Sequence, residues 1–158
     1  MSIESTTYSY HVAEQALSYK AFLSAQVDGE VSVEVLDGGR MIANDTVQTA
    51  GRAEIRTRLF IEEPILWSPE QPHLYEVRLT LLDHASGERD EATSYTGLRE
   101  VSVTGGQLCL NGAPLYLRGV LDQGYFPEGW YTATTDGALR RDVELTLAMG
   151  FTCARKHQ

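Results

Sequence analysis

The side chains best suited to chemistry in this sequence gather near its C-terminal end. Asp122 and Gln123 directly follow one apolar, strand-like run, and Arg155 and His157 close the next one. A carboxylate, an amide, a guanidinium and an imidazole can all bind polar groups through hydrogen bonds, and the carboxylate and imidazole can also transfer protons. Whether these four side chains meet depends on how the two runs are arranged in space.

Other kinds of site have weaker support. His11, His73 and His84 are scattered without the H-x-x-x-H spacing of a zinc site, so we expect no metal centre. Gly105 and Gly106 indicate a turn, because neither of the glycine patterns of phosphate-binding loops occurs. The two cysteines, Cys109 and Cys153, are either two small buried thiols or one disulfide.

Length and charge limit the function classes further. A chain of 158 residues corresponds to about one domain, or one and a fraction. Its 13 basic and 22 acidic side chains give a net charge of −9, which argues against a nucleic-acid partner. No apolar run of about 18 residues occurs, so we expect no membrane partner. The first residues do not resemble a signal peptide, and the compartment stays open.

Most of the chain, from Tyr8 to about Tyr95, has the pattern of β-strands. Residues 31–36 place Val31, Val33 and Val35 on one face, and the runs 19–27, 53–61 and 73–82 alternate in the same way. Such alternation is typical of antiparallel sheets with one buried face. About seven short strands separated by glycine-, proline- and aspartate-bearing turns predict an immunoglobulin-like β-sandwich over residues 1–97.

The pattern changes after Gly97. Two further hairpins are expected at Gly105-Gly106 and Asn111-Gly112, and an aromatic loop follows over residues 122–135. Thr135 or Asp136 is expected to cap a helix of about 13 residues that ends before Gly150, and a strand follows. A strand, a helix and a second strand form one βα unit and the start of another, which predicts a fragment of a larger α/β layer.

Four segments in order resemble glycoside hydrolase family 2, the β-galactosidase, β-glucuronidase and β-mannosidase group. They are LWSPEQPHLYEVRLTLLD (66–83), TGLREVSV (96–103), LCLNGAPLYLRGVLDQGYFPEG (108–129) and DGALRRDVELTLAMGFTCARKH (136–157). The resemblance implies a mainly β chain: an immunoglobulin-like antiparallel β-sandwich (1–97), then a connecting hairpin and the first β-α-β elements of a truncated (β/α)8 barrel (98–158). It also implies missing parts on both sides.

The same resemblance implies a retaining glycosidase that hydrolyses terminal β-linked sugars with two carboxyl groups. In this family the acid/base glutamate follows an asparagine on a later barrel strand. Asn44 and Asn111 precede Asp45 and Gly112, so no Asn-Glu pair exists here. The catalytic glutamates are therefore expected beyond the chain end, and the isolated chain is expected to be inactive.

The resemblance places Asp122, Gln123, Arg155 and His157 on the substrate side of the barrel, where barrel active sites lie. Asp122 would bind substrate hydroxyls or order its loop, and Arg155 would order the pocket or form a structural ion pair. The family histidine usually comes three residues after the arginine, whereas His157 comes two after. The aromatic residues of the loop could stack on sugars or simply pack together: Tyr125, Phe126, Trp130 and Tyr131.

Two other functions remain open at this point. The chain could be a non-catalytic sandwich that binds carbohydrate or protein, or an interdomain spacer, although neither explains the βα unit. We expect no cofactor. The expected partner is a carbohydrate substrate of the full-length enzyme, and a homodimer is one way to cover the orphaned barrel piece.

Overall fold

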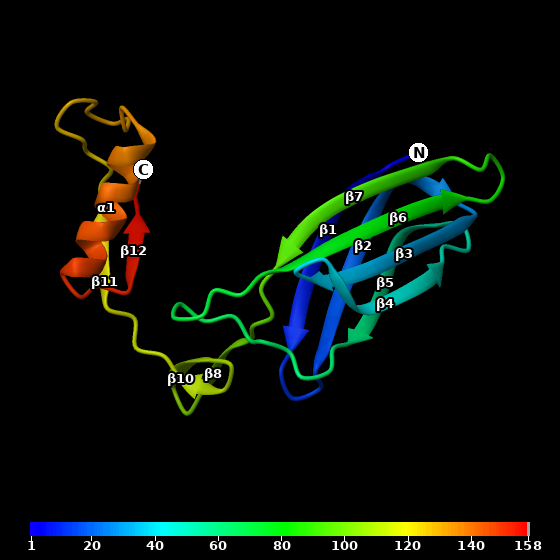
Figure 1. The fold of residues 1–158 in the computed structure, drawn as a ribbon, viewed down its shortest axis with the longest axis horizontal. Coiled ribbons are helices and arrows are strands. Elements are labelled where there is room, and N and C mark those ends of the chain that lie inside the picture. Colours follow the sequence, from blue (N-terminus) through cyan, green and yellow to red (C-terminus); the bar gives the residue numbers. More distant parts are fainter. Residues whose placement is uncertain (158) are drawn as a thin grey trace. The chain divides into compact units, whose positions relative to one another are not determined.

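The computed structural model describes residues 1–157. Most of the regular secondary structure in this range is β-strand (Figure 1). The chain forms two compact units, Met1–Pro114 and Leu115–Gln158, which we treat in turn. The strands of the first unit are β1 (Ile3–His11), β2 (Ala16–Val27), β3 (Gly29–Asp37), β4 (Arg40–Gln48), β5 (Arg52–Phe60), β6 (Tyr75–Asp83), β7 (Arg89–Thr96), β8 (Val101–Thr104), β9 (Gln107–Leu110) and β10 (Ala113–Pro114).

The first seven strands form the predicted β-sandwich. One sheet has the order β1-β2-β5 and the other β4-β3-β6-β7, and all of these pairs are antiparallel. Figure 1 shows the two sheets stacked as layers. The prediction of about seven short antiparallel strands in this part of the chain is confirmed.

The core lies between the two sheets and consists mainly of the inward residues of β2, β3, β5 and β6. The alternation predicted for β6 is correct, because its inward side chains are all buried: Tyr75, Val77, Leu79 and Leu81. The prediction for β2 is wrong at Ala25, which is exposed although Ala21, Leu23 and Val27 are buried. A register irregularity between Phe22 and Val27 breaks the alternation there, as a bulge does.

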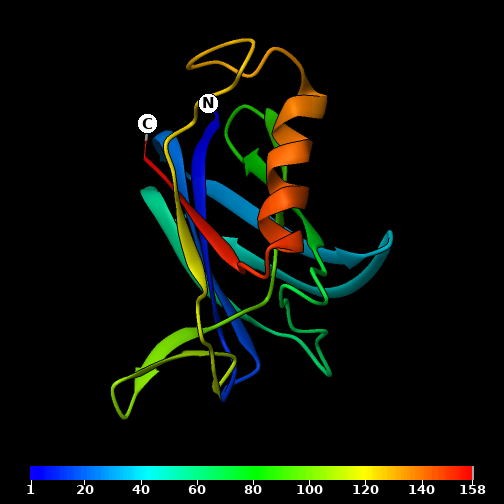
Figure 2. The ribbon, with the colours of Figure 1, turned by 90° about the vertical axis from the view of Figure 1, so that its left-hand side faces the viewer.

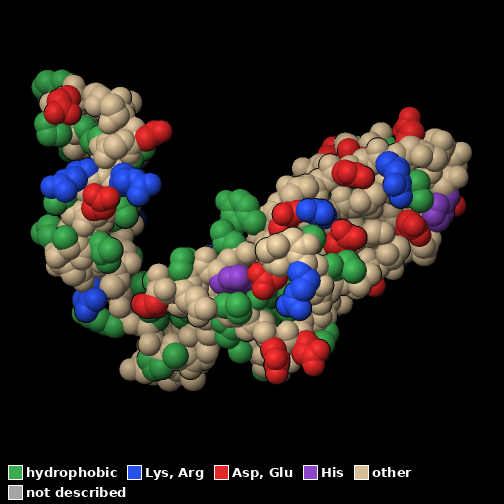
Figure 3. Space-filling model, viewed as in Figure 1, with side chains coloured by type: hydrophobic (Ala, Val, Ile, Leu, Met, Phe, Trp, Pro, Cys, Tyr) green, Lys and Arg blue, Asp and Glu red, His purple; other side chains and the backbone are tan. Residues whose placement is uncertain are grey.

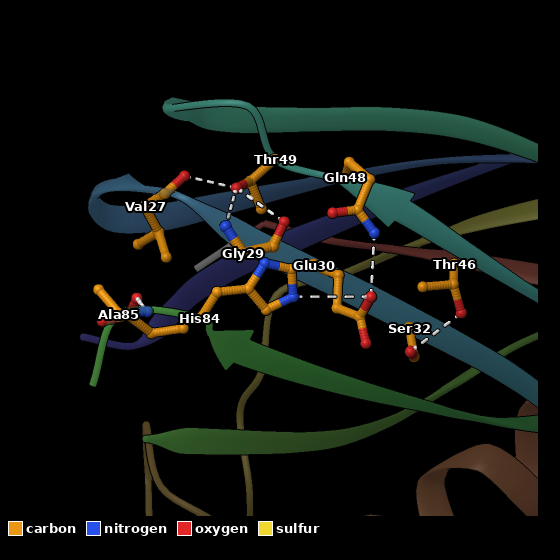
Figure 4. Close-up of polar contacts among 10 residues, drawn as sticks. Val27, Gly29, Glu30, Ser32, Thr46, Gln48, Thr49, His84 and Ala85 are labelled. Atoms are coloured by element: carbon orange, nitrogen blue, oxygen red, sulfur yellow. Dashed lines mark hydrogen bonds and ion pairs between the residues drawn. The ribbon is translucent and has the colours of Figure 1, made fainter. Parts of the chain in front are cut away.

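The chain crosses from one sheet to the other between β2 and β3. Gly29 begins β3, where a Cβ atom would lie 2.0 Å from the carbonyl oxygen of Leu82, so no other residue fits without a backbone shift. Thr49 is fully buried and serves this crossover: its Oγ1 accepts from the Gly29 amide at 2.9 Å and donates to the Val27 carbonyl (Figure 4).

The residues after 97 continue into the first unit. Leu98 is fully buried in the sandwich core, and its carbonyl accepts from the Trp67 amide at 2.9 Å. The carboxylate of Glu100 accepts from the Val12 amide at 2.8 Å. The side chain of Asn111 accepts a hydrogen bond from the Glu100 amide and donates one to the Trp67 carbonyl. The boundary predicted after residue 97 therefore falls one residue before a core side chain.

A sandwich that ends at Gly97 should be less stable than one that ends at Glu100. The shorter chain lacks the buried Leu98, whose burial contributes about 1.5–3 kcal/mol. It also lacks the hydrogen bond between Glu100 and Val12. Thermal unfolding of both truncated chains, followed by circular dichroism, would test this. Equal midpoints would show that Leu98 adds nothing to the sandwich.

The second unit contains β11 (Gly119–Asp122), the helix α1 (Asp136–Ala148) and β12 (Cys153–Lys156). The two strands pair in parallel. Figures 1 and 2 together show α1 running in the opposite direction along one side of the pair. The helix has the predicted boundaries: Thr135 Oγ1 accepts from the Ala138 amide at 3.1 Å, and Gly150 follows with a φ of +85°.

Much of the apolar surface of this unit is uncovered. The helix has no buried residue, and Val143 and Leu147 are each 69% exposed. Green hydrophobic side chains are accordingly visible around α1 in Figure 3. Helix–strand packing within the unit therefore leaves the apolar side chains of α1 largely exposed. Among residues 1–157, no helix combines the length and the hydropathy needed to cross a membrane.

Candidate functional site

The parallel pairing of β11 with β12 places the predicted site residues at neighbouring strand ends but on different faces. Asp122 is the register partner of Lys156, and Leu121 is the partner of Arg155. Because side chains alternate between the faces of a strand, Asp122 and Lys156 share one face, and Leu121 and Arg155 lie on the other. The four candidate residues therefore do not form one cluster.

Asp122 is engaged at both carboxylate oxygens. Its Oδ1 accepts from the Gly124 amide at 2.7 Å, and its Oδ2 lies 2.8 Å from the Nζ atom of Lys156. The hydrogen bond from Lys156, followed by the bond from the Gly124 amide, lowers the pKa of Asp122 below its usual range. This geometry suits a carboxylate that orders the loop after β11.

Gln123 and His157 lie side by side, and Arg155 lies apart from them. The Nδ1 atom of His157 is 3.1 Å from the Oε1 atom of Gln123, and the His157 amide donates to the Asp122 carbonyl at 2.9 Å. Arg155 is exposed, and within residues 1–157 its side chain has no ion-pair or hydrogen-bond partner. Its guanidinium is therefore free to bind a ligand.

The aromatic loop has its own structure. Phe126 and Trp130 form an antiparallel bridge in which each amide donates to the other carbonyl, at 2.7 and 2.9 Å. Tyr125 and Tyr131 flank this bridge, with ring centroids 5.0 Å apart. The rings of Tyr125, Trp130 and Tyr131 are exposed, whereas Phe126 is only 9% exposed. Three of the four aromatic residues could therefore meet a ligand.

A cavity of about 440 Å³ lies between this loop, β12 and the start of α1. Gln123, Phe126, Tyr131, Leu139 and Lys156 contribute to its wall. Sequence reasoning missed Lys156, since a single lysine next to the arginine of a motif gives no signal by itself. The register of β11 with β12 is the information that places it beside Asp122.

A larger groove of about 630 Å³ lies on the sandwich, beside β1, β7 and Trp67. Its charged residues already have partners within the unit. Glu100 accepts from the Val12 amide, and the guanidinium of Arg99 lies 4.4 Å from the centroid of the Trp67 ring. The cavity of the second unit is therefore the better candidate, although it is smaller. Residues 1–157 contain no group of three or more potential metal ligands close together.

Comparison with known proteins gives consistent matches. The sequence model of Glycosyl hydrolases family 2 matches residues 3–99. A beta-galactosidase of Photobacterium profundum is 32% identical over 151 residues, which are 89% of this chain and 14% of that protein. A beta-galactosidase of Erwinia tasmaniensis is 44% identical over 85 residues, which are 52% of this chain and 8% of that protein. The chain thus spans only a small part of the length of these relatives.

Solved structures show a similar fold. A b-glucuronidase from Ruminococcus gnavus, in complex with N1-substituted uronic isofagomine, superposes with a TM-score of 0.81 at 22% identity. The match covers 99% of this chain and 26% of that one. The complex of the same enzyme with D-glucuronic acid gives a TM-score of 0.80 at 23% identity. At these identities the likeness concerns the fold alone.

Proposed function

Because this chain belongs to glycosyl hydrolases family 2, we propose that it is part of a retaining glycoside hydrolase that acts on terminal β-linked sugars. The match to the family over residues 3–99 carries this proposal. The relatives named as beta-galactosidases make a β-galactoside the first substrate to test.

In this proposal the domain organisation follows the resemblance. Residues 1–97 are the immunoglobulin-like sandwich domain, and residues 98–158 contain the connecting hairpin and the N-terminal part of a (β/α)8 barrel. The parallel order of β11, α1 and β12 supports the second assignment, because parallel strands joined by a helix are the repeating unit of such a barrel. Barrel active sites form at the C-terminal ends of the strands, where Gln123, Arg155 and His157 lie.

The reaction would be a double displacement through a glycosyl-enzyme intermediate. One carboxyl group acts as nucleophile at the anomeric carbon, and the other first protonates the leaving oxygen and later deprotonates water. The present sequence contains no Asn-Glu pair, so we assign both roles to residues of the whole protein that follow it. Gln123, Arg155 and His157 would bind and orient the sugar.

The exposed apolar side chains of the second unit fit the same proposal. Val143, Leu147 and Met149 would be covered by further strands and helices of the barrel in the whole protein. Exposing one such side chain instead of burying it costs about 1.5–3 kcal/mol. In the isolated chain, a two-fold dimer through this surface is our proposal for its cover.

We expect the isolated 158-residue chain to hydrolyse no chromogenic β-galactoside, β-glucuronide or β-mannoside, because it lacks the carboxyl pair. The whole protein that contains this sequence should hydrolyse at least one of them with retention of configuration. Both proteins should be assayed side by side, with folding checked by circular dichroism. A folded whole protein that cleaves none of the three, or activity of the isolated chain that follows the protein peak, would refute the proposal.

A further inference from the structure

The side chain of Lys156 makes three contacts that all lead to the same segment. Its Nζ atom lies 2.8 Å from Oδ2 of Asp122 and 5.5 Å from the centroid of the Phe126 ring. Its Cε and Nζ atoms also lie close over Gly124, where a Cβ atom would be 3.2 Å from both. Lys156 therefore extends from β12 over the first residues of the aromatic loop.

Two of these contacts involve the most buried residues of the second unit. Among its described residues only Gly124 and Phe126 are buried. The Gly124 amide donates to Asp122, and Gly124 has a φ of +74°, so the loop turns sharply at this point. A lysine stem that covers an aromatic ring while its charge meets a carboxylate is suited to fixing such a turn.

Few other contacts connect the loop to β12. The Phe126–Trp130 bridge and the Tyr125–Tyr131 contact lie within the loop itself. The bond between Gln123 and His157 reaches the residue directly after β12, and it is exposed, as is the bond between Lys156 and Asp122. Lys156 thus joins β12 to Asp122 at the start of the loop by a charged hydrogen bond, and its stem contacts Gly124 and Phe126 within the loop.

We infer that Lys156 is a positioning residue: through Asp122, Gly124 and Phe126 it fixes the loop 123–133, which forms one wall of the 440 Å³ cavity. Asp122 then orders the loop together with Lys156 and leaves substrate binding to Gln123, Arg155 and His157. The consequence for sugar binding rests on the proposed glycosidase function, whereas the ordering of the loop does not.

Amide hydrogen exchange of the 158-residue chain, measured by NMR, tests the ordering directly. In Lys156→Met the amides of Gly124, Phe126 and Trp130 should exchange about three to ten times faster, as expected for the loss of a partly exposed ion pair with its hydrogen bond. Lys156→Arg should restore most of the protection, because it keeps the charge. Arg141→Met, which removes an exposed cation of α1, is the matched control and should leave these amides unchanged.

The amide of Met149, which donates to Leu145 at 3.0 Å, reports whether the whole unit has opened. In Lys156→Met the exchange of the Met149 amide could accelerate by the same factor as that of the loop amides. The loop exchange rates of Lys156→Arg then show whether the charge of residue 156 orders the loop. If the loop amides of Lys156→Arg exchange as slowly as in the wild type, the inference is supported. If they exchange as fast as in Lys156→Met, it is contradicted. Unchanged loop exchange in Lys156→Met would also contradict it.

Kinetics of the whole protein test the consequence for substrate. Lys156→Met should raise KM about tenfold and change kcat by less than about threefold, because a displaced wall weakens binding of substrate and transition state alike. A faster-exchanging loop with an unchanged KM would overturn the positioning role toward substrate. A wild-type whole protein that cleaves no glycoside would refute the proposed function, and the exchange data would still decide the ordering role.

Discussion

Replacing Leu79 with alanine should lower the free energy of unfolding of the sandwich by about 2–5 kcal/mol. Leu79 lies on β6, one of the two central strands of the four-stranded sheet, and is almost completely buried between the two sheets. Its neighbours on β3 and β7 are held in register by the ladders on both sides, so the structure can collapse only partly into the cavity. Both the lost burial and the remaining cavity therefore reduce stability.

The measurement is urea unfolding followed by the far-ultraviolet β signal of the sandwich. Leu74→Ala is the matched control, because it removes the same atoms from a side chain of the same unit that is 49% exposed. We expect the control to change stability by less than about 1 kcal/mol. Similar losses for both variants would show that the inner face of β6 does not form the core described above.

Replacing Thr49 with valine should lower the free energy of unfolding by about 1–3 kcal/mol, although the two side chains have nearly the same shape. Valine cannot accept the hydrogen bond of the Gly29 amide, which is buried and would lose its partner at 2.9 Å. The carbonyls of Val27 and Gly29 would lose the same hydroxyl (Figure 4). Both carbonyls would keep a backbone donor, from Gly51 and Thr49, so the crossover would contain one unsatisfied buried donor, the Gly29 amide.

Thr46→Val is the control for this substitution. Thr46 is on β4 and its hydroxyl lies 3.0 Å from that of Ser32, at an exposed position where water can replace it. Thr46→Val should change the free energy of unfolding by no more than about 0.5 kcal/mol. If thermal unfolding gives the same midpoint for Thr49→Val as for wild type, the network at Gly29 does not support the crossover.

Local features of this protein could be predicted from its sequence. The inward face of β6 follows from alternation, since successive side chains of a strand point to opposite faces. The start of α1 at Thr135 and its end before Gly150 follow from capping chemistry, which involves residues within one helical turn. The Asn111-Gly112 turn has positive φ at both residues, as its sequence requires.

Features that depend on distant pairing needed the tertiary structure. Thr49 and Gly29 are 20 residues apart, and Asp122 and Lys156 are 34 apart, so no local pattern joins them. The irregularity in β2 that exposes Ala25 depends on how β2 pairs with β5. For the candidate site, the sequence placed Asp122, Gln123, Arg155 and His157 at the ends of two strands, and the structure has them at the ends of β11 and β12. The sequence could not show that the pleat separates Asp122 from Arg155 and brings Lys156 to Asp122, because the register of two strands is set by packing across the whole unit.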